Sequence, residues 1–168
     1  MNKSALLKIA LAMIFLCVAV VIFIKLSPAQ ESRHEDAFFY DLVERQLFVA
    51  PKGSIPPIKG MKGADQAGVR AIVICTNGNP ADQRHRVIAY LEKYSPEIKQ
   101  LFESVRQDRA AGRSPQVSID RRQIPPNTLV RRLSDTDWHA LNTPEGEQIV
   151  NEWNTPGPDG RSPIVCSP

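Results

Sequence analysis

The densest group of chemically active side chains lies in the segment Asp135-Thr136-Asp137-Trp138-His139. Its two carboxylates and its imidazole are groups that serve in acid–base catalysis and in metal binding. Acidic residues are also common in the first turn of a helix, where capping and the helix dipole favour them. We expect Asp135 and Asp137 to start a short helix, and we keep Asp135, Asp137 and His139 as candidate catalytic residues of an alternative, enzymatic function.

The remaining motifs give little support to a metal or cofactor site. His34, His85 and His139 are far apart, and none has a second His or Cys at metal-ligand spacing. The motif Asn77-Gly78-Asn79-Pro80 follows a predicted strand, where α/β folds often bind ligands, but it lacks the glycines and the lysine of nucleotide-binding loops. We expect a plain turn there, no metal and no cofactor, with the Asn77–Asn79 loop as a second candidate for an enzyme site.

Charge is segregated along the second half of the chain. Seven arginines lie between residues 106 and 132, whereas residues 134–160 hold six acids and no Lys or Arg. The two segments either neutralise each other or form a docking surface, for which Arg is suited because it binds carboxylates and phosphates in a bidentate way. Our predicted partner-binding residues are Arg121, Arg122, Arg131, Arg132, Trp138 and Trp153.

Two cysteines lie outside the apolar N-terminal segment, and each ends a strand-like run. Cys75 follows Ala71-Ile72-Val73-Ile74, and Cys166 follows Ile164-Val165. In an oxidising compartment these cysteines can form a disulfide, and we predict the pair Cys75–Cys166. The alternative is two small buried apolar side chains.

The N-terminus predicts a membrane anchor. Residues 9–24 are uncharged and apolar, and the extended segment 5–26 would be about 33 Å long as a helix, enough to cross the hydrocarbon layer. The alternative is a signal peptide cleaved near Ala29, because residues 27–29 are small. The lysines before the segment favour a cytoplasmic N-terminus and an extracytoplasmic C-terminal domain, which is periplasmic if the cell is bacterial.

We divide the chain into an anchor or signal peptide (residues 1–30), a juxtamembrane helix with a Pro/Gly-rich arm (31–69) and a small extracytoplasmic α/β domain (70–168). A capping-box pattern at Ser32 and apolar residues at helical spacing predict a helix over 33–49, which docks on the domain or lies on the membrane. The arm over 50–68 is rich in Pro, Gly and Lys.

The domain itself is predicted to begin with a strand over 71–75, followed by two helices. Val87, Ile88 and Leu91 share one face of the first helix, and Ser95-Pro96 starts the second, which Gly112 ends. Further along the chain we expect strands at 116–119, 128–133 and 163–166, and helices at 135–141 and from Thr143 onwards.

These elements indicate an α/β or α+β fold. The chain is expected to have a single N-terminal transmembrane helix followed by one small, loop-rich mixed domain.

Three of the 21 Lys and Arg residues lie in the first 26 residues, so 18 remain to balance 18 Asp and Glu. A neutral domain argues against nucleic acid as a partner. We expect a non-catalytic, membrane-anchored subunit that binds a protein of an envelope complex; the alternative is a cell-envelope hydrolase or transferase.

Overall fold

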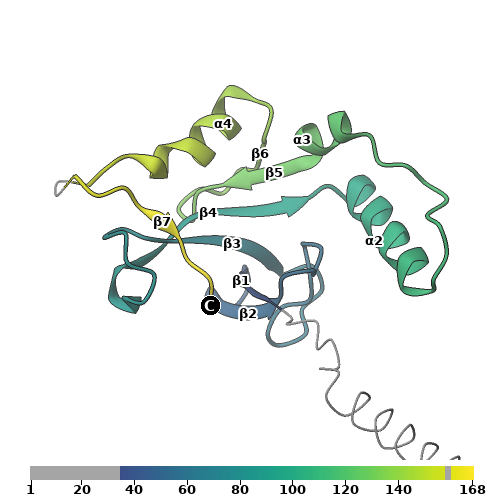
Figure 1. Ribbon diagram of the computed structural model, residues 1–168, viewed down its shortest axis with the longest axis horizontal. Coiled ribbons are helices and arrows are strands. Elements are labelled where there is room, and N and C mark those ends of the chain that lie inside the picture. Colours follow the sequence, from purple (N-terminus) through teal and green to yellow (C-terminus); the bar gives the residue numbers. More distant parts are fainter. Residues whose placement is uncertain (1–34, 158–159) are drawn as a thin grey trace, which may run out of the picture. The chain divides into compact units, whose positions relative to one another are not determined.

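The computed structural model describes residues 35–157 and 160–168, which form a mixed α+β domain. Its antiparallel sheet has the strand order β2-β1-β3-β4-β5-β6, and β7 pairs with β3 (Figure 1). The strands are β1 (Asp36–Asp41), β2 (Gln46–Pro51), β3 (Gly68–Cys75), β4 (Arg86–Tyr94), β5 (Thr128–Arg131), β6 (His139–Ala140) and β7 (Ile164–Val165). The helices are α2 (Pro96–Ala110), α3 (Ile124–Asn127) and α4 (Pro144–Asn151), with short 3-10 turns η1 (Gln83–His85), η2 (Arg121–Gln123) and η3 (Glu152–Asn154).

The helix predicted over residues 33–49 is wrong, because the described part of this segment is a β-hairpin. β1 pairs with β2 along its whole length, and its other edge pairs with β3. Phe38 and Phe39 are both buried although they point to opposite faces, an arrangement that suits a strand buried on both faces. The hairpin belongs to the same sheet as β3, so the compact unit begins at Glu35 and not near residue 70.

The second error is at β4, which the sequence predicts as a helix. The strand pairs with β3 on one edge and with β5 on the other. Leu91 is fully buried and its neighbour Tyr90 is nearly so, on opposite faces of the sheet. An apolar run of this length fits either a helix or a central strand, and here two partner strands decide in favour of the strand.

Several predicted elements are confirmed. The strand at residues 71–75 is β3, Ser95 and Pro96 start α2, and Thr143 and Pro144 start α4. The strand predicted at 128–133 is present as β5, with Val130 inside.

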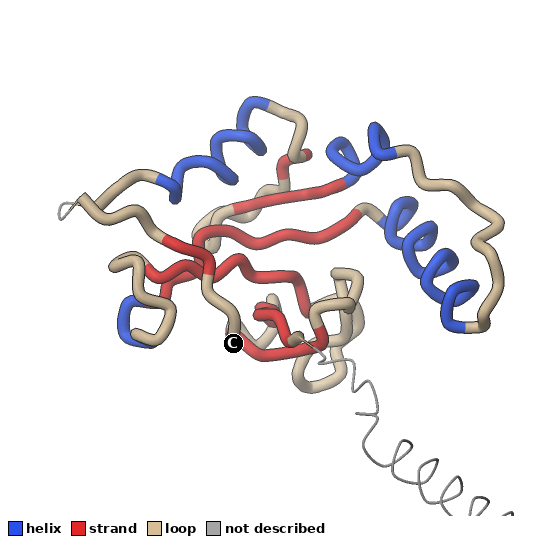
Figure 2. The backbone as a smooth tube through the Cα atoms, viewed as in Figure 1, coloured by secondary structure: helices blue, strands red, loops and turns tan. Residues whose placement is uncertain are grey.

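Two predictions in the second half of the chain are wrong. Residues 116–119 are not a strand but part of the long loop after α2 (Figure 2). The helix predicted at 135–141 is absent, because residues 139–140 pair with β5 as β6. The acids before β6 therefore lie in a strand-to-strand connection and not at a helix start.

Apolar side chains gather on both faces of the sheet. One cluster comprises Phe38, Val69, Ala71, Val73 and Leu91, with Trp138 packed against it. The other comprises Tyr90, Val130 and Ile149, with Trp153 at its margin, so α4 covers this second face (Figure 1). The turn Asn77-Gly78 is present as predicted, with Gly78 at a φ of 69°.

The predicted disulfide between Cys75 and Cys166 is confirmed. The two Cα atoms are 6.1 Å apart, and the bond joins the end of β3 to the residue after β7. The backbone N–H of Cys166 also donates to the carbonyl of Val73, at 2.8 Å. The C-terminal strand is thus held to β3 both covalently and by the sheet.

The predicted anchor, residues 5–26, and the possible cleavage point near Ala29 lie outside the described residues and stay predictions. Within residues 35–157 and 160–168, no helix has the length and the apolar character needed to span a bilayer.

Candidate anion-binding pocket

Helix α2 positions the most distinctive polar cluster of the domain. The hydroxyl of Ser95 caps its first turn, and Ile98 is almost fully buried beneath it. One turn later the Phe102 ring packs against Tyr94, with ring centroids 5.0 Å apart. Because side chains three, four and seven residues apart share one helix face, Val105, Arg106 and Arg109 follow Phe102 along the same side.

The wall opposite α2 is the loop that follows β2. The N–H of Tyr94 donates to the Pro56 carbonyl at 3.2 Å, and the Lys99 ammonium donates to the Pro57 carbonyl at 2.5 Å. Pro56 and Pro57 are joined by a cis peptide bond and are buried. These contacts hold the loop against both β4 and α2.

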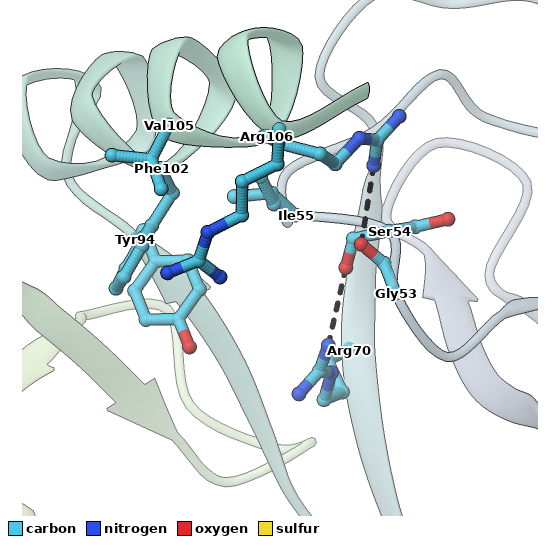
Figure 3. Close-up of a pocket in the computed structure, with 9 residues that line it drawn as sticks. Gly53, Ser54, Ile55, Arg70, Tyr94, Phe102, Val105 and Arg106 are labelled. Atoms are coloured by element: carbon cyan, nitrogen blue, oxygen red, sulfur yellow. Dashed lines mark hydrogen bonds between the residues drawn. The ribbon is translucent and has the colours of Figure 1, made fainter. Parts of the chain in front are cut away.

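A pocket of about 300 Å³ lies between this loop, α2 and the strands β3 and β4 (Figure 3). Its apolar side is formed by Ile55, Tyr94, Phe102 and Val105. Its basic side is formed by three arginines from two distant parts of the chain, Arg70 of β3 and Arg106 and Arg109 of α2. Gly53 and Ser54 complete the rim.

Backbone carbonyls hold two of the three guanidinium groups. Arg70 donates through Nη2 to the carbonyls of Lys52 and Ser54, each at 3.1 Å, and Arg106 donates through Nη1 to the carbonyl of Gly53, also at 3.1 Å. Figure 3 shows the bonds from Arg70 to Ser54 and from Arg106 to Gly53. A carbonyl orients a guanidinium without neutralising its charge. The Nε atom of Arg70 is buried and has no hydrogen-bond partner among the described residues.

Glu92 is the acid that acts on Arg70, its cross-strand partner in β4. Burial raises the pKa of Glu92, and the charge of Arg70 opposes that rise. Burial likewise raises the pKa of Tyr94, so its hydroxyl keeps its proton at neutral pH. In the described part of the chain no ion pair joins Arg106 or Arg109 to a carboxylate.

A second cavity continues the pocket along α2. It shares Ser54, Ile55 and Arg106 with the first, and it is also lined by Lys59 and Lys99. Glu103 lies in the same cavity, 3.6 Å from the Lys99 ammonium. The two cavities together make a predominantly basic groove that ends, at one end, in an apolar pocket with three guanidinium groups.

The candidate catalytic residues do not form a connected site in the described structure. The Asp135 carboxylate accepts hydrogen bonds from Arg132 at 3.2 Å and from Ser134 at 3.0 Å, and these bonds lower its pKa against the effect of burial. Asp137 is exposed, and His139 lies in β6 opposite Val130. Within residues 35–157 and 160–168, no hydrogen bond or ion pair links Asp135, Asp137 and His139, and no His, Cys, Asp or Glu cluster is arranged for a metal ion.

The side chains of the Asn77–Asn79 loop are engaged within the loop. The Asn77 side-chain oxygen accepts from the N–H of Asn79 at 3.0 Å, and that of Asn79 accepts from Ala81 at 3.1 Å. Asp82 binds both the Asn77 amide and His85, at 3.0 and 2.8 Å. Hydrogen bonding to His85 is the main cause that lowers the pKa of Asp82. These bonds explain the shape of the turn.

The predicted partner-binding residues divide into two groups. Arg132 is engaged with Glu152 through both oxygens, the Nε bond being 2.6 Å, and Arg131 donates to the Asp135 carbonyl. Trp138 is half-buried, with the Lys93 ammonium 4.4 Å and the Arg131 guanidinium 5.0 Å from its ring, and Trp153 is half-buried on the second apolar cluster. Arg121 and Arg122, in contrast, are exposed on η2.

The pocket is not predictable from the sequence, because its basic residues are far apart in the chain. Arg106 and Arg109 belong to the basic segment 106–132, and their spacing of four and seven residues from Phe102 places them on one helix face. No residue near Arg70 in the sequence indicates that it lines the same pocket, because its position there depends on β4 and on the loop before β3.

Comparisons of the chain with protein-family models, curated proteins and solved structures found no match. The class that the observations define is therefore structural: a small, disulfide-bonded α+β domain with an arginine-lined pocket beside its longest described helix.

Proposed function

We propose that this chain is a membrane-anchored, extracytoplasmic, non-catalytic subunit that binds a partner protein of an envelope complex through the groove beside α2. The apolar residues 5–26 support the anchor, and the disulfide supports an oxidising compartment. The partner presents acidic groups to the groove.

One observation carries the proposal. Arg106 and Arg109 are exposed at a pocket with an apolar wall, and no carboxylate of the described chain pairs with them. Guanidinium groups next to aromatic side chains are typical of the energetically important centres of protein interfaces. Residues 27–168 as a whole are neutral, with 18 Lys and Arg against 18 Asp and Glu, so the local positive charge of the pocket favours an acidic surface and gives no general attraction to polyanions.

The proposal is tested by purifying the full-length protein from its native membrane in mild detergent without reductant and identifying what co-purifies in stoichiometric amount. The same purification is made with Arg106→Gln/Arg109→Gln and with the matched pair Arg121→Gln/Arg122→Gln, which removes two exposed arginines outside the pocket. We expect the first variant to lose the partner and the second to keep it.

If only the Arg121/Arg122 variant loses the partner, the interface lies at Arg121 and Arg122, as predicted from the sequence, and not at the groove beside α2. A protein that purifies alone under these conditions would contradict the proposal. Determination of the N-terminus of the same material decides between an anchor and a secreted protein cleaved near Ala29.

A further inference from the structure

We infer that the pocket binds the free C-terminal carboxylate of a polypeptide whose last residue is apolar. This inference rests on the proposed function, because it specifies which part of the partner enters the groove beside α2.

The apolar and basic sides of the pocket belong to one small cavity. Its volume of about 300 Å³ is at the lower end of the range for ligand pockets. A ligand therefore has to present an apolar group and an anion within a few bonds of each other. The last residue of a polypeptide does so, because its side chain and its carboxylate are attached to the same Cα atom.

The donors of the pocket are arginines. Arg70 and Arg106 are oriented by backbone carbonyls. Arg109 lines the same pocket, and no carboxylate of residues 35–157 or 160–168 forms an ion pair with it. Guanidinium groups hold carboxylates through parallel, charge-assisted hydrogen bonds, and orienting them beforehand reduces the entropy lost on binding.

The groove offers a path for the rest of the peptide. From the pocket, the groove continues past Ser54, Ile55 and Arg106 to a second cavity of about 440 Å³ lined by Lys59 and Lys99. Tyr94 and Arg70, from the two central strands, line the pocket itself but not this continuation. A peptide can thus lie along α2 with its last residue in the pocket.

The test uses the full-length protein in detergent micelles and fluorine NMR of the peptide acetyl-Gly-Gly-(4-fluoro-Phe). The peptide is compared as the free acid and as the C-terminal amide. We expect the free acid to bind at least about tenfold more tightly than the amide, because the amide loses charge-assisted hydrogen bonds. Arg106→Gln/Arg109→Gln is expected to abolish the difference, and the control Arg121→Gln/Arg122→Gln to preserve it.

Two further probes test whether binding requires a C-terminal carboxylate and an apolar group. The peptide acetyl-Gly-(4-fluoro-Phe)-Glu-Gly-amide carries an internal acid, and inorganic phosphate is an anion without an apolar group. The inference is overturned if the free acid and the amide bind with equal affinity, or if neither binds. It is also overturned if the peptide with the internal acid binds as tightly as the free acid, or if phosphate displaces the free acid when present at an equal concentration. If these peptides fail while the native partner still depends on Arg106 and Arg109, the proposed function stands and only the C-terminal recognition is wrong.

Discussion

Asp41, at the end of β1, is a buried carboxylate that accepts three backbone hydrogen bonds. It is fully buried, and it accepts the backbone N–H groups of Val43 and Glu44 at 2.9 and 3.0 Å. Its second oxygen accepts the N–H of Met61 at 2.7 Å. A side chain on Gly60 would overlap this oxygen. One carboxylate thus joins the hairpin turn to the loop that carries one wall of the arginine pocket.

Stability at acid pH provides a test of this role. The N–H of Glu44, followed by those of Met61 and Val43, lowers the pKa of Asp41 despite its burial. A lowered pKa means that the stabilisation is present above the ordinary aspartate value, about 3.9, and is lost as pH falls through the folded-state value. We expect Asp41→Asn to be less stable than wild type at pH 7, with a difference that shrinks as the pH is lowered below about 4.

The measurement is urea unfolding of both proteins between pH 7 and pH 3. Asp36→Asn is the control, because Asp36 is an exposed aspartate in the same strand. A constant difference between wild type and Asp41→Asn over this range would show that the charge of Asp41 does not contribute.

Helix α4 approaches the sheet through a glycine. Gly146 lies in its first turn, and the Gly146 N–H donates to the Thr143 hydroxyl at 3.2 Å. A Cβ atom at this position would overlap the carbonyl oxygen of Ala140 in β6. This close approach allows Ile149 to pack in the second apolar cluster with Tyr90 and Val130.

In Gly146→Ala, a gain in helix propensity is therefore opposed by a loss of packing between α4 and β6. Alanine favours a helix by about 1 kcal/mol over glycine, but displacing α4 from β6 costs about 1–3 kcal/mol. We expect a net loss of stability in urea unfolding. The matched change Gly53→Ala is expected to be nearly neutral, because no described residue other than its two chain neighbours has an atom within 4 Å of the added methyl group. A more stable Gly146→Ala protein would show that α4 can move away without loss.

Across the whole domain, the disulfide joins two residues 91 positions apart, so its loop contains β4, β5, β6 and all the described helices. In the chain-entropy model a loop of this length stabilises the folded state by about 4.5 kcal/mol. The sheet alone holds β7 by only two residue pairs, Ile74 with Val165 and Cys75 with Ile164. The covalent bond therefore closes the domain at its C-terminus.

We expect Cys75→Ala/Cys166→Ala to lower the free energy of unfolding by several kcal/mol, and reductant to bring the wild type close to the level of this variant. Urea unfolding with and without reductant measures both effects. Reductant should leave the variant unchanged, which is the control for its effects elsewhere. Equal stability of wild type with and without reductant would contradict this role of the disulfide.

Local signals in the sequence were sufficient for several elements. Ser95-Pro96 and Thr143-Pro144 start helices because a hydroxyl caps the first turn and proline fits the first helical position without needing its missing N–H. The strand at residues 71–75 and the pairing of its cysteine were also predictable, from an uninterrupted apolar run and from the small number of cysteines. The helix starts and the strand depend on residues that are close together in the sequence. The disulfide is predictable because few cysteines are available to pair.

Tertiary structure alone decided β1, β2, β4 and the arginine pocket. The apolar residues of β1 and β4 fit a helix or a strand, and the free energy of pairing with neighbouring strands selects the strand, although that pairing involves residues distant in sequence. Arg70 meets Arg106 and Arg109 only because β3, the loop after β2 and α2 converge. A short sequence window contains the partners of a helix cap, but it does not contain the partners of a sheet or of a pocket.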